Sequence, residues 1–194
     1  MDSYKTIKSL SEGQYSEKRS KFLASAHPVQ NVDEVKDILA EYRKKYYDAR
    51  HVCYAYSILP DLERANDDGE PSSTAGKPIL GQIHSHELRN ILIIVVRYYG
   101  GVNLGTSGLI VAYRTAAAEA IGNAEIITRT IDEDLDITFD FAKMNNVMKV
   151  VKDMNPKIIA QGYENNLCTM TLRIRKDLMP QLKDRLTKYN DLFL

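Results

Sequence analysis

The residues best suited to bind a charged ligand follow an apolar run, in a stretch that begins with Arg97-Tyr98-Tyr99. A glycine-rich turn comes next, and it contains Gly100, Gly101, Gly105 and Gly108. Glycine allows positive φ angles and lets another group approach the backbone closely. The pattern after the turn is helical, and the first turn of a helix offers unpaired N–H groups and the positive end of its dipole to an anion. The stretch therefore predicts an anion site. The alternative is a turn that only lets a strand and a helix pack closely.

Two hydroxyl side chains stand where this helix should begin. Thr106 and Ser107 could cap the helix or donate a hydrogen bond to an oxygen ligand. A second glycine and cation occur together at Gly76-Lys77, and Pro78 fits the first turn of a short helix there. Neither turn has the spacing of a dinucleotide-binding or P-loop motif. We expect the two turns to lie side by side and to face one cleft.

Three carboxylates, Asp67, Asp68 and Glu70, precede the second turn. They could hold a divalent cation through oxygen ligands, although their spacing is not that of an EF-hand. They could instead cap turns or pair with Arg50 and Arg97. Because Arg97 follows an apolar run, its stem should be partly buried, and a buried guanidinium needs a partner. We therefore expect at least one of these carboxylates to pair with Arg97 or Arg50 in the unliganded protein.

No arrangement typical of catalysis or of a bound cofactor is visible in the sequence. Cys53 and Cys168 lie far apart without metal-ligand spacing, and Cys53 is expected in the core. His84 and His86 could share a metal only with a third ligand from elsewhere, so a surface pair is expected. We accordingly assign no catalytic residue, no metal ligand and no cofactor.

Hydrophobic patterns predict the elements that position these residues. Residues 91–96 are apolar without interruption, which is typical of a strand buried on both faces. Residues 109–121 have helical periodicity. Residues 51–58 alternate as a strand whose small side should meet a helix. Residues 31–46 predict a helix that begins with a capping box.

Two further segments of the first half have weaker signals. Residues 4–27 predict β structure with a turn at Gly13. Residues 59–77 predict a long polar loop, and long ordered loops tend to carry function.

A shift in composition near residues 129–133 indicates a domain boundary. We expect one domain at residues 1–130 and a second at residues 131–194. The second has the order β-α-β-β-α, which is that of a split βαβ, ferredoxin-like domain. Its last strand is expected to be short or missing.

The overall composition restricts the classes of function. The 194 residues include 26 Lys plus Arg and 26 Asp plus Glu, so the net charge is zero. Nucleic-acid binding would therefore need a local cationic site. The amino terminus lacks the apolar segment of a signal peptide, and the longest apolar run is too short to span a bilayer. We expect a cytoplasmic protein with reduced cysteines and no membrane contact.

Several motifs, read together, resemble the IMPACT family, and most closely its bacterial YigZ-type members. They are residues 67–71 (DDGEP), 74–78 (TAGKP) and 97–105 (RYYGGVNLG), supported by Ser20-Lys21-Phe22 and Ala49-Arg50-His51. The resemblance implies an α+β protein of two domains. The amino-terminal βαβ sandwich would be similar to the second domain of a small-subunit ribosomal protein, and the carboxyl-terminal, ferredoxin-like domain to one in elongation factor G. Eukaryotic members are linked to control of the starvation-sensing translation kinase, a role that we do not carry over.

The function expected from these observations is that of an RNA- or ribosome-associated binding protein that could regulate translation. The expected ligand-binding residues are Arg50, Lys77, Arg97, Tyr98, Tyr99, Gly100, Gly101, Gly105, Thr106 and Ser107, supported by the acidic residues Asp67, Asp68 and Glu70. Two alternatives stay open: a metal-dependent enzyme acting on a phosphorylated small molecule, and a protein-interaction module without chemistry. The sequence does not indicate an oligomeric state.

Overall fold

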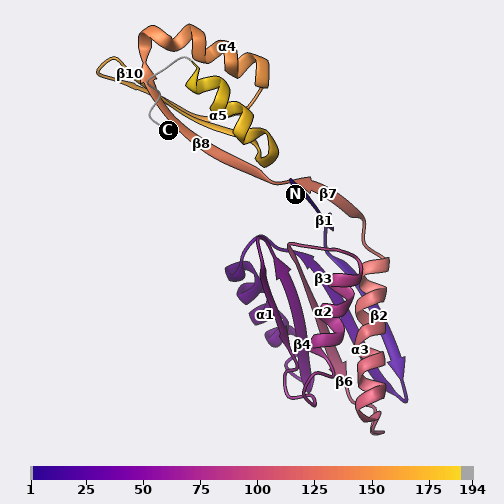
Figure 1. The fold of residues 1–194 in the computed structure, drawn as a ribbon. Helices are drawn as coiled ribbons and strands as arrows, with labels where there is room; N and C mark the ends of the chain where they lie inside the picture. The colour runs from indigo at the N-terminus through magenta and orange to yellow at the C-terminus, as the bar shows by residue number, and fades with distance from the viewer. Residues whose placement is uncertain (1, 189–194) are drawn as a thin grey trace. The chain divides into compact units, whose positions relative to one another are not determined.

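The computed structural model describes residues 2–188, which form two compact units (Figure 1). The larger unit comprises residues 5–128, and the smaller one comprises residues 2–4 and 129–188. The described chain is a mixed α/β protein with three separate sheets. No helix within residues 2–188 is both long and apolar enough to cross a membrane.

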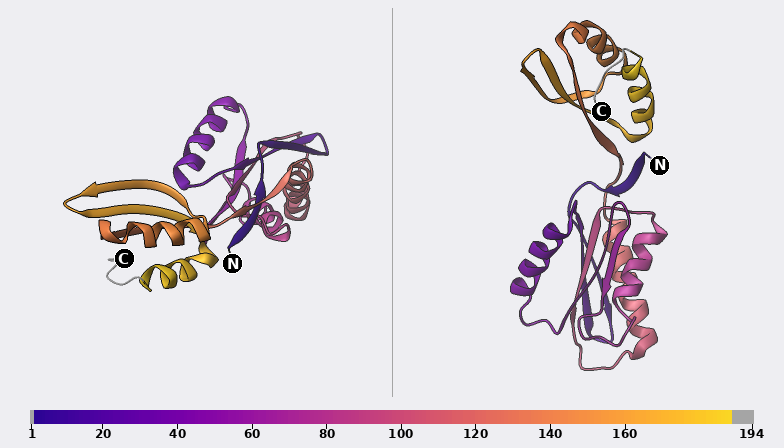
Figure 2. Two further views of the ribbon diagram at one scale, coloured as in Figure 1. Left: turned by 90° about the horizontal axis from the view of Figure 1, so that it is seen from above. Right: turned by 60° about the vertical axis from the view of Figure 1, so that its left-hand side comes forward.

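The larger unit is built on a five-stranded antiparallel sheet in the order β2-β3-β6-β4-β5. Its strands are β2 (Ser11–Glu17), β3 (Ser20–Pro28), β4 (His51–Ile58), β5 (Leu62–Asn66) and β6 (Ile91–Tyr98). One face is covered by α1 (Val32–Lys45), and the other by α2 (Gly76–Ser85) and α3 (Gly105–Gly122) (Figures 1 and 2). The sheet is therefore the middle layer of three.

Strand β6 is the centre of this unit and is buried on both faces, as predicted. Ile91, Ile93 and Val95 belong to the core under α2 and α3. Leu92, Ile94 and Val96 belong to the core under α1. Both neighbours of β6 run antiparallel to it, and its continuous apolar run reflects the helical layer on each side.

Helix α1 and strand β4 were also predicted correctly. In α1, the N-cap Asn31 accepts a hydrogen bond from the backbone of Glu34 over 2.9 Å, which is half of a capping box. Strand β4 directs Val52 and Tyr54 toward α1, while Cys53 and Ala55 lie in the core on the other face. The small side of β4 meets α2, as its side-chain sizes predicted.

Two predictions about loops in this half were wrong. Gly13 lies inside β2 and is not a turn residue. The strand carries a glycine there because α3 packs closely on it: a Cβ would lie 2.3 Å from the Ala120 backbone nitrogen. The stretch 59–77 is not one loop, because Leu62–Asn66 forms β5 and pairs with β4. Strand β5 is an edge strand with mostly exposed side chains, so it lacks the apolar alternation that identifies a strand.

The smaller unit has the predicted order of elements. It contains β8 (Asp132–Asp140), α4 (Met144–Met154), β9 (Lys157–Glu164), β10 (Leu167–Arg175) and α5 (Met179–Thr187), with short 3-10 turns before each helix. The sheet order is β8-β10-β9, fully antiparallel, and one core of residues such as Phe139, Val147 and Leu182 joins sheet and helices. A last strand, predicted to be short or missing, would lie outside the described residues. A separate two-stranded sheet pairs β1 (Ser3–Ile7) with β7 (Ile126–Thr130).

Candidate functional site

The candidate site lies at the end of the three central strands of the larger unit, on the face that α3 covers. Strand register places Arg97 of β6 beside Phe22 of β3 and beside His51 of β4. Arg97 follows Val95 by two positions, so it points to the same face as the core residues under α3. Three side chains from distant parts of the sequence thus form one row across the sheet.

Arg97 is almost fully buried, with 6% of its surface exposed. Its Nη1 donates a hydrogen bond to Glu70 Oε1 over 2.6 Å. Its guanidinium carbon lies 5.5 Å from the ring centroids of both Phe22 and Tyr99. Its Nε is buried and has no hydrogen-bond partner among the described residues. The predicted pairing of an acidic residue with Arg97 is confirmed, and the pairing still leaves Arg97 with donors to spare.

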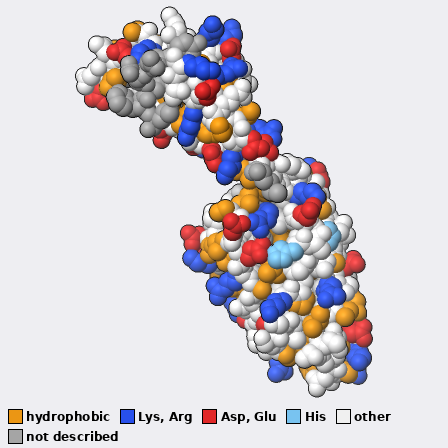
Figure 3. All heavy atoms as spheres, viewed as in Figure 1, with side chains coloured by type: hydrophobic (Ala, Val, Ile, Leu, Met, Phe, Trp, Pro, Cys, Tyr) orange, Lys and Arg blue, Asp and Glu red, His pale blue; other side chains and the backbone are white. Residues whose placement is uncertain are grey.

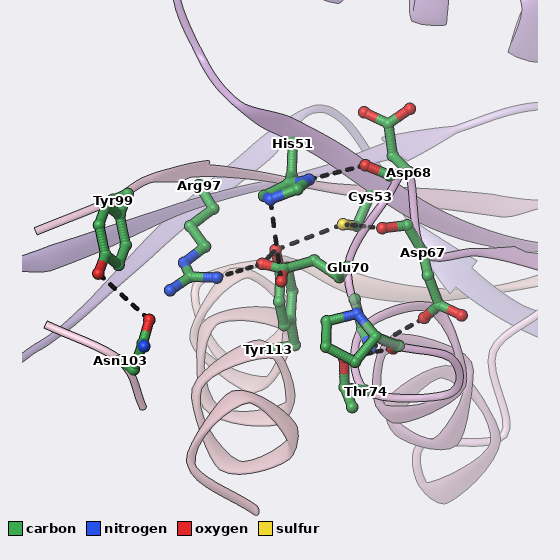
Figure 4. A network of polar contacts seen from close by, with 12 residues as sticks. His51, Cys53, Asp67, Asp68, Glu70, Thr74, Arg97, Tyr99, Asn103 and Tyr113 are labelled. Carbon is green, nitrogen blue, oxygen red and sulfur yellow. Dashed lines mark hydrogen bonds and ion pairs between the residues drawn. The ribbon is translucent and has the colours of Figure 1, made fainter. Parts of the chain in front are cut away.

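Glu70 is held by a buried polar network (Figure 4). Its Oε1 also accepts a hydrogen bond from the Tyr113 hydroxyl over 2.8 Å, and Cys53 Sγ lies 3.3 Å from that hydroxyl. Burial raises the pKa of the Cys53 thiol and of the Tyr113 phenol, and the Glu70 carboxylate raises both pKa values further. Both groups therefore stay protonated at neutral pH. Cys53 is a core residue, as predicted, and it has no nucleophilic character.

His51 completes the row, although sequence reasoning did not single it out as a binding residue. Its Nδ1 lies 2.7 Å from the carbonyl oxygen of Asp68. Because a carbonyl oxygen can only accept a hydrogen bond, Nδ1 is the donor and carries a hydrogen. Its Nε2 lies 3.9 Å from Glu70 Oε2. The strand register that places His51 beside Arg97 has no local signature in the sequence.

A cavity of about 470 Å³ opens at this end of the sheet. Arg97, Glu70 and His51 line it together with two exposed residues, Arg50 and Tyr99. The segment that leads into α3 also lines it, at Asn103, Leu104, Gly105 and Thr106. The expected binding residues Arg50, Arg97, Tyr99, Gly105 and Thr106 are thus brought together. Sequence reasoning missed His51, Asn103 and Tyr113.

The start of α3 faces this cavity without a cap. The helix begins at Gly105, which has φ +71°, and no side chain of residues 2–188 caps its first turn through a hydrogen bond. Of the two roles predicted for Thr106 and Ser107, capping the helix was therefore wrong, and donation to an oxygen ligand stays a prediction. Both residues lie inside the first turn, and Leu104 occupies the N-cap position. The first N–H groups of α3 remain available to an anion.

The start of α2 differs, because a carboxylate of the chain already occupies it. Asp67 Oδ1 accepts hydrogen bonds from the backbone of Ala75 and Gly76, over 3.0 and 2.8 Å. Asp67 Oδ2 accepts another from the backbone of Ser73, over 2.8 Å. Asp67 therefore takes the place of an external anion at the start of α2, and the anion site expected at α3 stays a prediction.

Lys77 does not join the cavity. It lines a separate hollow with Ser73 and Arg114, between α2 and α3. The prediction that both glycine-rich turns face one cleft was therefore wrong. The start of α2 is hydrogen-bonded to Asp67 of the preceding loop. Of that loop and α2, only residues 69–71 line the cavity of Arg97.

Other expected binding residues have structural roles. Tyr98 points to the α1 face and donates a hydrogen bond to Asp48 over 2.9 Å. Gly100 packs on the β2–β3 turn, where a Cβ would lie 2.1 Å from the carbonyl carbon of Arg19. Gly101 has φ +84° and Ser107 is exposed, and neither lines the cavity.

The acidic residues are engaged by the protein itself. Asp68 pairs with Arg43 over 2.9 Å and accepts a hydrogen bond from the backbone of Val52 over 2.7 Å. With Asp67 at the start of α2 and Glu70 on Arg97, all three carboxylates cap or pair, which was one of the two alternatives. Within residues 2–188, no group of three His, Cys, Asp or Glu side chains is arranged to hold a metal ion.

The fold and the site define a two-unit α/β protein with a cationic cavity at the end of a central β-strand. Residues 18–121 match the family described as the Impact N-terminal domain. This match covers more than half of the chain, and the chain therefore belongs to the IMPACT family.

Relatives and solved structures extend the likeness over most of the chain. IMPACT family member YigZ of Escherichia coli (strain K12) is 31% identical over 151 residues, 76% of this chain and 74% of the relative. IMPACT family member YvyE of Bacillus subtilis (strain 168) is 29% identical over 169 residues, 86% of this chain and 78% of the relative. A crystal structure of a hypothetical protein has 25% identity and a TM-score of 0.76, covering 100% of this chain and 96% of the other.

Proposed function

We propose that this protein binds RNA, free or on the ribosome, and that it receives phosphate in the cavity of Arg97. The observation that carries the proposal is Arg97, which lines the cavity and whose buried Nε has no hydrogen-bond partner in the described part of the chain. A buried polar group without a partner is costly, so its persistence in a cavity favours a ligand that completes it.

The surroundings of Arg97 favour phosphate as that ligand. Arg50 is exposed on the cavity and has no partner among the described residues. The uncapped start of α3 adds N–H donors and the positive end of a helix dipole. Arginine and helix starts are the usual phosphate ligands of proteins.

Tyr99 favours a nucleic acid over a simple phosphate. Tyr99 lines the cavity and is 43% exposed, and its hydroxyl donates a hydrogen bond to Asn103 over 3.2 Å. An exposed ring next to a phosphate site can stack on a base, a contact common in proteins that bind single-stranded RNA.

The charge distribution supports a local site. Figure 3 shows Lys and Arg side chains interspersed with Asp and Glu on the face in view, in keeping with a net charge of zero. Binding through a general basic surface is therefore not proposed. The metal-dependent enzyme is not proposed either, because Asp67, Asp68 and Glu70 each serve protein donors.

For the two units, we propose the family's domain likenesses: a ribosomal-protein-like domain at residues 1–130 and a ferredoxin-like domain at residues 131–194. The smaller unit supports this through its β-α-β-β-α order and its β8-β10-β9 sheet. Its exposed sheet face carries Asp134, paired with Arg173, and Asp136, which accepts from Thr171. Since these carboxylates would repel phosphate, we assign RNA contact to the larger unit.

Fluorescence anisotropy with single-stranded RNA tests the proposal. Arg50→Gln and Tyr99→Ala should each weaken binding by about 1–2 kcal/mol, and Arg50→Gln should also reduce the salt dependence. Arg64→Gln is the matched control, since Arg64 is exposed on β5 and lies away from the cavity. Affinity unchanged in both cavity variants would refute the proposal. A pulldown with and without RNase is an independent check, because partners that are held through RNA should be lost after RNase treatment.

A further inference from the structure

We infer that the cavity receives a terminal phosphate, with the attached nucleoside stacked on Tyr99. The ligand class is a phosphomonoester, either at the end of an RNA strand or on a free mononucleotide. This inference rests on the proposed function, and it states which part of a nucleic acid the site recognises.

The first argument is access to Arg97. Only 7% of the Arg97 side chain is exposed, because the rings of Phe22 and Tyr99 lie over its guanidinium and Glu70 takes Nη1. A phosphate within an RNA strand is joined to a nucleotide on each side, and both neighbouring nucleotides would have to pass through the cavity opening. A terminal phosphate carries chain on one side only and can enter end-on. Deep placement of Arg97 therefore favours a terminal group.

The second argument is the number of donors. The cavity is lined by the guanidinium-bearing residues Arg97 and Arg50 and by Gly105 and Thr106, whose N–H groups belong to the first turn of α3. The Thr106 hydroxyl adds one more. A phosphodiester has two non-bridging oxygens, whereas a phosphomonoester offers three strong acceptor oxygens. Three strong acceptor oxygens can use more of these donors at once than two can, which favours a monoester.

The third argument is charge. Two arginines against the single carboxylate of Glu70 leave a surplus of one positive charge among the Arg and Glu side chains that line the cavity. The start of α3 contributes about half a positive charge more. A phosphomonoester carries about −1.5 to −2 at neutral pH, which suits this surplus better than the single charge of a diester.

The Glu70 carboxylate does not exclude a phosphate, because it is buried and already paired with Arg97 and Tyr113. Only 3% of its side chain is exposed, and its Oε1 accepts from both Arg97 and Tyr113. The carboxylate fixes Arg97 from the protein side. Figure 4 shows Glu70 between Arg97 and the Asp67–Cys53 contacts, with Tyr99 and Asn103 beyond Arg97.

The size of the cavity fits one nucleotide end. About 470 Å³ lies within the range of sites that bury a small molecule, roughly 300–1,000 Å³. Tyr99 stands beside Arg97, so a phosphate on Arg97 places the attached base near an exposed ring.

The experiment compares one short RNA sequence in four forms: with a 5′-phosphate, with a 3′-phosphate, with hydroxyl groups at both ends, and circularised. Competition anisotropy at fixed ionic strength measures each affinity. At least one phosphate-ended form should bind about tenfold or more tightly than the hydroxyl-ended and circular forms. Arg50→Gln and Thr106→Val should remove most of that difference, and Arg64→Gln should preserve it. Arg97→Lys, checked for folding by circular dichroism, should also remove it, since lysine lacks the planar fork.

Mononucleotides, nucleosides and inorganic phosphate serve as competitors to separate the two sources of a phosphomonoester. Competition by a mononucleotide as strong as that of the phosphate-ended RNA would assign the site to free nucleotides. Competition only by phosphate-ended RNA would assign it to strand ends. Equal binding of all four RNA forms would overturn this inference and leave RNA binding intact. Binding by none of the RNA forms and none of the competitors would overturn the inference and the proposed function together.

Discussion

Arg97 and Glu70 form an ion pair in which Nη1 lies 2.6 Å from Oε1 and both side chains are more than nine-tenths buried. Such a pair is sensitive to the loss of one partner, because the remaining charge stays in a medium that solvates it poorly. A change at either residue should therefore alter both the stability of the larger unit and the geometry of the candidate site. It fixes one guanidinium edge on Glu70 and leaves other donors of Arg97 for a ligand.

Replacing Arg97 by alanine should lower the free energy of unfolding by about 3–5 kcal/mol, because Glu70 would remain buried without its cation. Lys77→Ala is the control, and it should change stability by no more than about 0.5 kcal/mol, since Lys77 is exposed and unpaired in the described structure. Chemical denaturation followed by circular dichroism measures both. Equal losses in the two variants would contradict a structural role for the ion pair.

Gly100→Ala should destabilise the larger unit by about 1–3 kcal/mol, as overpacking does. Its Cβ would lie 2.1 Å from the carbonyl carbon of Arg19 and 2.3 Å from the nitrogen of Ser20, and backbone cannot move aside cheaply. Gly81→Ala, in α2, has no neighbour within 4 Å and should raise stability by about 0.5–1 kcal/mol. Thermal unfolding of the pair checks both signs. A neutral Gly100→Ala would show that the turn at Arg19 is free to shift.

Asp67→Ala should lower the free energy of unfolding by about 1–3 kcal/mol, because three backbone N–H groups at residues 73, 75 and 76 would lose their acceptor. Asp37→Ala, at an exposed position of α1, provides the control for removing a carboxylate. Hydrogen exchange should locate the effect in the first turn of α2. Unchanged exchange of the Ala75 and Gly76 amides would be inconsistent with this capping role.

Alkaline pH should destabilise the larger unit. Burial is the largest cause that raises the pKa of the Cys53 thiol above its ordinary value of 9.0 and that of the Tyr113 phenol above 10.0. The unfolded chain releases the Cys53 proton near pH 9 and the Tyr113 proton near pH 10, whereas the folded chain keeps both. The unfolded state then binds fewer protons, so this contribution to stability is complete below pH 9 and declines above it.

Cys53→Ala removes one of these protons and should make the fall in stability above pH 9 less steep than in the unaltered chain. Denaturation curves at a series of pH values measure the two slopes. The comparison concerns the slopes alone, since the smaller side chain also lowers stability at neutral pH. Identical slopes would mean that the Cys53 thiol ionises as easily in the folded protein as in the unfolded one.

Much of the fold follows from patterns that are local in the sequence. The apolar run at residues 91–96, the alternation at 51–58 and the helical stripe after Gly105 each identify their element, because each repeat matches the geometry of one strand or helix. The same holds for the β-α-β-β-α order of the smaller unit. The pairing of an acidic residue with Arg97 was also predictable, since a buried guanidinium needs a counter-charge.

Tertiary structure alone decided which residues form the site. Strand register places His51 and Phe22 beside Arg97, and register depends on the whole sheet. Asp67 caps a helix that begins nine residues later, and this leaves α3 as the helix start that faces the cavity, with Lys77 elsewhere. The sequence determined the chemical groups, because composition and periodicity are local. Their grouping into one cavity required long-range packing, which local patterns do not encode.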